Sequence, residues 1–167
     1  MIKPTRSQVP GVFTSRPTLC GLATILVTLP LLIMPPDARA EGPSCSLSRA
    51  AATWTFTDSG TVIGVGLRTA VGKFTLNGAG SLLNGVATSS LNGNIAEETF
   101  DGTYTVNSDC TGTFSVQIFS GGAELFAVTM YVVYDKKMEH VHALFTSVVA
   151  PNGVSLPTVI AADGHRD

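Results

Sequence analysis

The sequence predicts an all-β domain, an antiparallel meander closed into a barrel or a sandwich, behind an N-terminal secretion signal. Three observations predict this. From residue 50 onward, short runs rich in Thr, Val, Phe and Tyr are separated by Gly and Asn at intervals of about ten residues. No stretch of this region keeps an amphipathic helical period for three turns. The first 40 residues have the composition of a secretory signal.

The N-terminal segment contains the three parts of a signal peptide. A basic leader precedes an apolar run at 19–34, and an A-x-A site then ends at Ala40, after which we expect cleavage. The alternative is an uncleaved membrane anchor, which the short and interrupted run disfavours because a span needs about 20 apolar residues. The sequence therefore predicts a helical signal peptide at 1–40 and a secreted domain at 41–167.

Cleavage changes the charge of the mature chain. It removes four of the ten basic residues and one of the twelve acidic residues, which leaves a formal net charge of −5. An acidic surface of this kind has no electrostatic reason to bind nucleic acid or an anionic membrane. The mature length is sufficient for one hydrophobic core.

Two of the three cysteines remain after cleavage. Cys20 leaves with the signal, and an even pair, Cys45 and Cys110, enters an oxidising compartment, where we expect a disulfide. The loop-entropy relation gives such a bond about 4 kcal/mol of stabilisation. The alternative is two unrelated thiols.

The first three predicted strands are bounded by glycine and asparagine. The first, at 51–57, alternates aromatic residues with threonines and precedes a weakly determined connection at 58–67. The second, at 68–76, ends at the Gly-rich turn 77–80. The third, at 81–89, runs toward Asn92-Gly93, a pair that tolerates positive φ.

Five further strands complete the predicted sheet. The fourth, at 95–106, has Phe100, Tyr104 and Val106 in register around a bend at 101–102, and the fifth, at 111–119, alternates cleanly. The sixth, at 124–134, is apolar on both faces and is predicted to be buried on both sides. The seventh and eighth are expected at 138–149 and 154–161, followed by a loose tail at 165–167.

One segment carries a family resemblance. Residues 102–113 read Gly-Thr-Tyr-Thr-Val-Asn-Ser-Asp-Cys-Thr-Gly-Thr, and together with Cys45, Trp54 and the glycine blocks at 72–75 and 78–80 they resemble secreted bacterial proteins with a GTYTVNxDCTGT segment. The resemblance covers about residues 45–145 of the chain. It implies a small up-and-down barrel of about eight strands, of the calycin type found in allene oxide cyclases and lipocalins, and it implies no activity.

The chain departs from lipocalins at two points. The tripeptide Ala52-Thr53-Trp54 stands where lipocalins have Gly-x-Trp, and the arginine that caps many lipocalin barrels near the C-terminus has no clear counterpart.

Aromatic residues at alternating positions are the candidate binding residues. They either fill the interior or line one small ligand cavity, since a barrel of about eight strands allows both. The set comprises Trp54, Phe56, Phe74, Phe100, Tyr104 and Phe114. Of these, Trp54, Phe74, Tyr104 and Phe114 are the predicted lumen residues.

No catalytic, metal or cofactor site is predicted. His140 and His142 share a strand face but lack a third ligand, and Glu139 is expected on the opposite face, so both histidines are interpreted as surface residues. Glu97 and Glu98 are adjacent, hence on opposite faces, and are interpreted as solvated strand-edge charge. Gly64-Val65-Gly66 lacks the third glycine of a dinucleotide motif.

Three functions remain open. The favoured one is a non-enzymatic secreted barrel that binds a small apolar ligand or a partner protein. The second is a cyclase-like enzyme that acts on an apolar substrate inside the barrel, with Glu98 or His142 as the polar group that steers it. The third is a structural or oligomeric envelope protein, in which the outward face of 124–134 packs on a second subunit.

Overall fold

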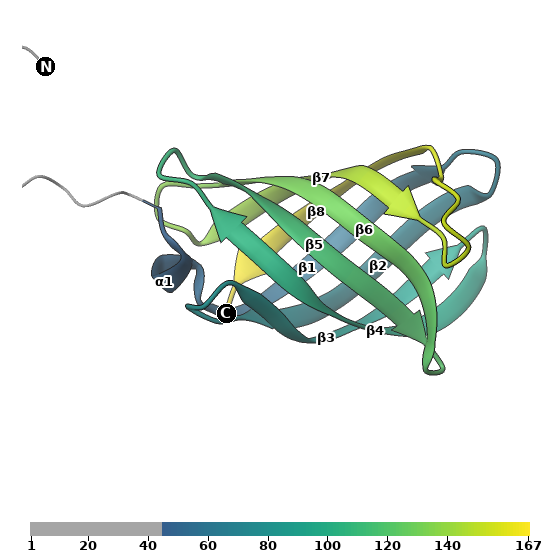
Figure 1. Ribbon diagram of the computed structural model, residues 1–167, viewed down its shortest axis with the longest axis horizontal. Helices are drawn as coiled ribbons and strands as arrows, with labels where there is room; N and C mark the ends of the chain where they lie inside the picture. Colours follow the sequence, from purple (N-terminus) through teal and green to yellow (C-terminus); the bar gives the residue numbers. More distant parts are fainter. Residues whose placement is uncertain (1–44) are drawn as a thin grey trace, which may run out of the picture. The chain divides into compact units, whose positions relative to one another are not determined.

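The computed structural model describes residues 45–167, and the expected signal peptide at 1–40 lies outside them. Each strand pairs antiparallel with the next, and β8 pairs with β1, so the sheet is a closed barrel (Figure 1). This confirms the predicted all-β barrel of eight strands. No helix in the described part of the chain is long and apolar enough to cross a membrane. The elements are α1 (Leu47–Ala50), β1 (Ala52–Val62), β2 (Gly66–Leu76), β3 (Ser81–Leu91), β4 (Asn94–Val106), β5 (Thr111–Ser120), β6 (Ala123–Tyr134), β7 (His140–Val149) and β8 (Thr158–Arg166).

Alternation along each strand decides which side chains enter the barrel. In β5, Phe114, Val116 and Ile118 are buried, whereas Ser115 and Gln117 between them are exposed. Successive side chains of a strand point to opposite faces, so a period-two sequence places its apolar set inside. The core is therefore the interior of the barrel, built from the inward positions of all eight strands.

Two predicted boundaries are wrong. β1 continues to Val62, so only residues 63–65 separate it from β2, and the expected connection at 58–67 is a tight hairpin. β8 lies four residues later than predicted and includes Arg166, so the C-terminal residues are not a loose tail. Pro157 lies inside the predicted strand 154–161, and a proline has no N–H to give to a ladder.

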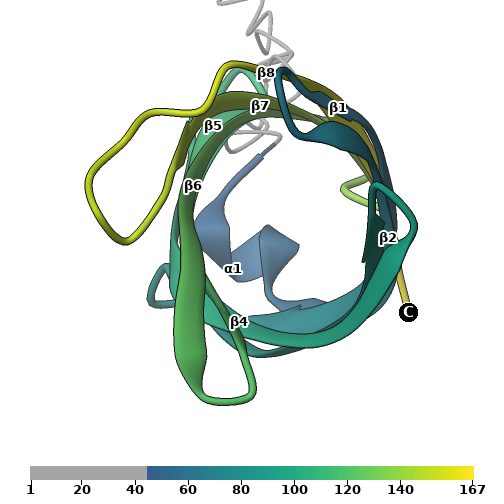
Figure 2. The same ribbon diagram turned by 90° about the vertical axis from the view of Figure 1, so that its right-hand side faces the viewer.

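Arg166 and Trp54 close the end of the barrel that α1 covers. They are opposite each other in the β1–β8 ladder. The Arg166 guanidinium donates to the carbonyl oxygens of Arg49 (3.0 Å) and Ala51 (3.4 Å), and Trp54 Nε1 donates to that of Ala50 at 2.9 Å. Arg166 is thus a C-terminal arginine that caps the barrel, which sequence inspection did not find. Figure 2, viewed into the barrel, shows α1 across the far end.

The predicted disulfide is present. Cys45 is bonded to Cys110 in the β4–β5 turn, with 5.1 Å between their Cα atoms and a sequence separation of 65. The Tyr104 hydroxyl lies 3.0 Å from the carbonyl oxygen of Leu47 in α1. Together these links hold α1 against the end of the sheet.

The outward face of β6 corrects another prediction. Val128, Val132 and Tyr134 are buried, but Tyr131 is 48% exposed and Val133 is 42% exposed. A barrel made from one sheet has a single interior, and no helix among residues 45–167 covers this outer face. The strand is therefore buried on one side only.

Candidate ligand-binding lumen

Four phenylalanines form a cluster inside the barrel. The ring centroids of Phe56, Phe74 and Phe100 lie 5.7–6.2 Å apart, and Phe114 lies 5.9 Å from Phe74. Most of these contacts are edge-to-face, the arrangement that aromatic rings prefer. Gly85 makes room for the cluster, because a Cβ at that position would lie 2.3 Å from Cδ2 of Phe100.

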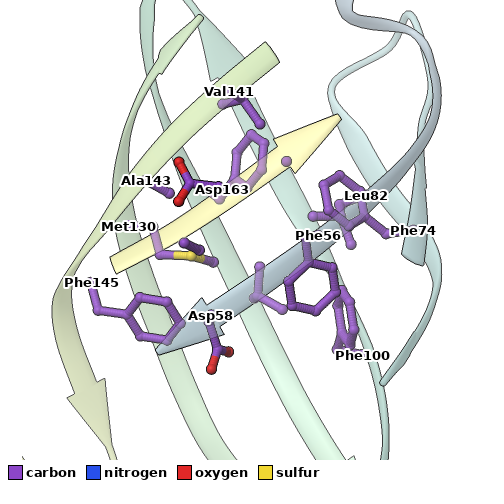
Figure 3. Close-up of a pocket in the computed structure, with 14 residues that line it drawn as sticks. Phe56, Asp58, Phe74, Leu82, Phe100, Met130, Val141, Ala143, Phe145 and Asp163 are labelled. Atoms are coloured by element: carbon purple, nitrogen blue, oxygen red, sulfur yellow. The ribbon is translucent and has the colours of Figure 1, made fainter. Parts of the chain in front are cut away.

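A cavity of about 60 Å³ lies beside this cluster (Figure 3). Its walls are almost entirely carbon atoms. Its far side is formed by residues from β6, β7 and β8, namely Met130, Val141, Ala143, Phe145, Ala162 and Gly164. The volume exceeds what one water needs but is below the roughly 150 Å³ of an apolar cavity that binds benzene. A small apolar group therefore fits, whereas a ring requires lining side chains such as the flexible Met130 to shift.

Three charged side chains are buried inside the same barrel. Asp58, Arg68 and Glu98 are 3%, 6% and 4% exposed and come from β1, β2 and β4. Arg68 donates to both carboxylate oxygens of Glu98, with Nη1–Oε1 at 3.0 Å and Nη2–Oε2 at 2.9 Å. The Ser89 hydroxyl donates to Oε1 of Glu98 at 2.7 Å. The side-chain contact of Asp58 within this cluster is longer, 3.5 Å from Oδ2 to Nη2 of Arg68.

The two buried carboxyl groups have opposite pKa shifts. Burial raises the pKa of Asp58, and the positive charge of Arg68 offsets this only in part. Burial acts on Glu98 in the same direction, but the hydrogen bonds from Arg68 and Ser89 outweigh it and hold its pKa below the usual value. The difference follows from geometry, because Glu98 receives three short side-chain hydrogen bonds, whereas Asp58 receives one long side-chain bond and a backbone bond from Ala70 that do not outweigh burial.

One oxygen of Asp58 is left without a partner. Oδ1 is buried and has no hydrogen bond. Asp58 forms part of the cavity wall, and Figure 3 shows its carboxyl group at the cavity edge, between the side chains of Phe145 and Phe56. A buried acceptor without a donor costs free energy comparable to a lost hydrogen bond. This oxygen is thus an unpartnered polar atom of a residue that lines the cavity.

A second pocket lies on the other side of the charged cluster. It has a volume of about 260 Å³ and is lined by residues of the β1–β2, β3–β4 and β5–β6 hairpins. Figure 1 shows these hairpins at the barrel end opposite α1. Arg68, Ser89 and Glu98 line this mouth, together with apolar side chains such as Leu91 and Phe126. The cluster therefore borders both spaces, with Asp58 on the inner cavity and Arg68 and Glu98 on the mouth.

The predicted lumen residues are divided between two places. Phe74 and Phe114 line the inner cavity. Trp54 and Tyr104 are buried beside α1, where Trp54 packs on Tyr134 with ring centroids 5.8 Å apart. A ligand-binding role for all four remains a prediction.

Only one of the two glutamates that were predicted to be solvated lies on the surface. Glu97 is exposed, but Glu98 is buried, so the interpretation of Glu98 as solvated edge charge is wrong. Glu98 is an even number of residues from Phe100 and Tyr104, so its side chain points to the same, inward face of β4.

Both histidines lie on the outer surface. His140 and His142 are exposed, and Nδ1 of His142 contacts Oδ1 of Asp163 on the neighbouring strand. Glu139 lies in the turn before β7, and its carboxylate is within 4.8 Å of ligand atoms of Asp135 and His140, so the prediction that it faces away is wrong. His142 consequently cannot steer a substrate inside the barrel.

Sequence inspection missed Asp58, Arg68 and Ser89 as interior groups. The signal was present, because Asp58 continues the inward series of Trp54 and Phe56 once β1 is extended to Val62. Ending the first strand at residue 57 and beginning the second at residue 68 placed Asp58 in a loop and left Arg68 at a strand end, which concealed their partnership.

Comparisons with known proteins show the fold alone. The chain is similar to a solved structure described as EF1p2_mFAP2b bound to DFHBI, with 12% identity and a TM-score of 0.55 over 75% of this chain and all of that one. It also matches a redesigned β-barrel, mFAP1, bound to DFHBI, with 16% identity and a TM-score of 0.49 over 72% of this chain and 98% of the other. A phycobiliprotein lyase from Guillardia theta matches with 11% identity and a TM-score of 0.43 over 72% and 90% of the two chains. No protein-family model and no curated protein sequence matches.

Proposed function

We propose that this protein is an exported barrel that binds a small, mainly apolar molecule in its lumen without transforming it. The observation that carries the proposal is the apolar cavity inside the barrel, bordered by a buried carboxyl oxygen without a partner. Ligand sites are typically apolar pockets with a few polar groups that fix orientation, and this cavity has that composition. The ligand reaches it from the mouth, since α1 and its hydrogen bonds close the other end.

Export is the second part of the proposal. A Cys45–Cys110 disulfide is expected in a secreted or periplasmic protein and is rare in the cytosol. A secreted or periplasmic location is also supported by the predicted signal at 1–40, which would leave a mature domain at 41–167. The resemblance to secreted bacterial barrels of the lipocalin or allene oxide cyclase type supports it as well. That a barrel of this general architecture holds a small molecule has a precedent in the DFHBI complex, but the proposal depends on the cavity of this chain.

The test compares two alanines on one strand of the mature protein. Ala162 lines the cavity, and its neighbour Ala161 points outward. Toluene is titrated into ¹⁵N-labelled protein, and binding is read from the amide shifts of residues 162 and 164. We expect Ala162→Leu to fill the cavity and weaken toluene binding by about tenfold or more, because a well-filled site leaves no room for the ring.

Ala161→Leu is the matched control and should bind toluene as the wild type does. Thermal melting of both variants checks that each is folded. If toluene causes no shifts in the wild type, or if Ala161→Leu weakens binding as much as Ala162→Leu, the lumen is not the binding site.

A cyclase-like enzyme is the second candidate. It requires an ionisable side chain inside the lumen, and Asp58 and Glu98 meet that condition, whereas His142 does not. Mass spectrometry of the small molecules that co-purify with the protein, before and after incubation, separates the two functions. A molecule recovered unchanged supports a binding protein, and an isomer formed at a rate that depends on Asp58 supports the enzyme.

A structural role rests on the outer surface of β6 and β7. Tyr131 is opposite Leu144 in the ladder, and both are exposed beside Val133. Sizing of the purified mature chain tests this candidate: a stable oligomer that Tyr131→Ser dissociates would support it, and a monomer would contradict it.

A further inference from the structure

Asp58 has the properties of an anchor for a positively charged group. The buried charged side chains of residues 45–167 are two carboxyl groups and one guanidinium. Arg68 donates its two short hydrogen bonds to Glu98 and lies 3.5 Å from Oδ2 of Asp58, so one guanidinium is shared by the two carboxyl groups. Its Oδ1 has no partner.

We propose that the lumen selects small apolar amines, whose ammonium group pairs with Oδ1 of Asp58 while the carbon skeleton occupies the apolar cavity. This rests on the proposed function and names the class of ligand. An ammonium group supplies both missing components, a hydrogen-bond donor and the opposite charge. A neutral alcohol supplies only the donor, and a carboxylate adds a third negative charge to the cluster.

The aromatic walls favour the same class. Phe56, Phe74, Phe100, Phe114 and Phe145 all line the cavity. Aromatic faces attract cations, and the attraction is larger in a desolvated site. Burying an ammonium ion is costly unless it is paired and hydrogen-bonded, so these rings could not hold an amine without the carboxylate.

Binding of an amine should depend on pH in a defined direction. The pairing needs ionised Asp58, whose pKa is raised by burial; the charged groups that face it are Arg68 on β2 and Glu98 on β4. As the pH falls through that raised pKa, Asp58 becomes protonated and the amine must displace the proton. Affinity therefore falls with decreasing pH, and binding in that range releases a proton.

Four compounds with the same ring test the proposal on wild-type protein. They are benzylamine, benzyl alcohol, toluene and phenylacetate, titrated at pH 8 with the amide shifts of residues 162 and 164 as readout. Hydrogen bonds that involve a charged group are stronger than those between neutral groups, so we expect benzylamine to bind at least about tenfold more tightly than toluene. Phenylacetate should be the weakest of the four.

Asp58→Asn is the decisive variant, with Asp101→Asn on the exposed face of β4 as its matched control. Asp58→Asn should remove the preference for benzylamine and leave toluene binding within about twofold, since asparagine keeps the shape but not the charge. Asp101→Asn should keep the preference. The wild-type series decides the matter even if Asp58→Asn does not fold.

The outcomes separate the two proposals. If toluene binds but benzylamine binds no better, the lumen is an apolar site without amine selectivity, and only the present inference fails. If none of the four compounds shifts these amides, the binding function itself fails. A preference for benzylamine that survives in Asp58→Asn would also overturn the inference, because the charge would then lie elsewhere.

Discussion

At the scale of single residues, Asp58 and Glu98 show how hydrogen bonding decides the state of a buried carboxyl group. Both are almost fully buried, and both contact the same arginine. Glu98 is held by Arg68 through two parallel bonds and by Ser89 through a third, which favours its ionised form. The hydrogen bonds to Asp58 are fewer, and the one from Arg68 is 3.5 Å long, so burial favours its protonated form.

The raised pKa of Asp58 predicts how its substitution affects stability at different pH values. Between the ordinary value of 3.8 and the raised folded-state value, the native protein keeps a proton that the unfolded chain has lost. The contribution of Asp58 to the free energy of unfolding therefore decreases as the pH rises through this window and is constant above it. We expect the stability of Asp58→Asn relative to the wild type to increase across the same window.

Urea denaturation at several pH values from 3.5 to about 8 measures this difference, with the lower limit set near the unfolded-state pKa of an aspartate. Asp101→Asn is the control and should show no comparable rise, because its carboxylate is exposed. A difference between Asp58→Asn and the wild type that is constant with pH would contradict the raised pKa.

At the scale of elements, the sequence predicted the number and order of the strands but not where β1 and β8 end, because strand ends depend on pairing with neighbouring strands. All eight strands were found, because most of them alternate apolar and polar residues and Gly- or Asn-containing turns separate them. The ends of β1 and β8 were missed: Ser59, Gly60 and Thr61 carry no apolar signal, yet β1 continues through them because it pairs with both β2 and β8. Part of the candidate site was missed for the same reason, since Asp58 lies in the extension of β1. Its aromatic half was predicted, and its charged half was missed because it depends on where β1 ends and β2 begins.

A bulge in β3 gives a prediction about packing. The register of β3 against β4 shifts between Leu82 and Gly85, where Asn84 has a φ of 54°. Gly85 then faces the ring of Phe100, and an added Cβ would lie 2.3 Å from its Cδ2 and 2.4 Å from its backbone oxygen. We expect Gly85→Ala to lower the free energy of unfolding by about 1–3 kcal/mol, the range for an overpacked core.

Gly78→Ala is the matched control for this substitution. A Cβ at Gly78 would meet nothing closer than 3.9 Å, so the change in unfolding free energy should stay within about 0.5 kcal/mol. Guanidinium denaturation of both variants measures the difference. Equal stabilities would show that β3 relaxes around the added methyl group and that the close fit of Phe100 is not required.

At the scale of the whole barrel, the two ends differ in how they are held. The end covered by α1 is fixed by a disulfide and by hydrogen bonds from Trp54, Tyr104 and Arg166 to the backbone of residues 47–51. The opposite end is formed by hairpins around the mouth pocket. This asymmetry suits a container with one closed end, in which the cavity and its charged cluster lie between a rigid base and an accessible mouth.

Removal of the disulfide tests this asymmetry. The bond spans 65 residues of sequence, for which the loop-entropy relation gives about 4 kcal/mol. We expect the double substitution Cys45→Ala with Cys110→Ala to lower the free energy of unfolding by about that amount. Amide hydrogen exchange should rise first at residues 47–51, which the bond holds in place, and last in the central ladders of β5 and β6.

Adding a reductant to the wild type should reproduce the loss of stability and leave the double variant unchanged. If exchange instead rises first at the mouth hairpins, α1 is held by its hydrogen bonds alone, and the disulfide acts mainly on the unfolded chain.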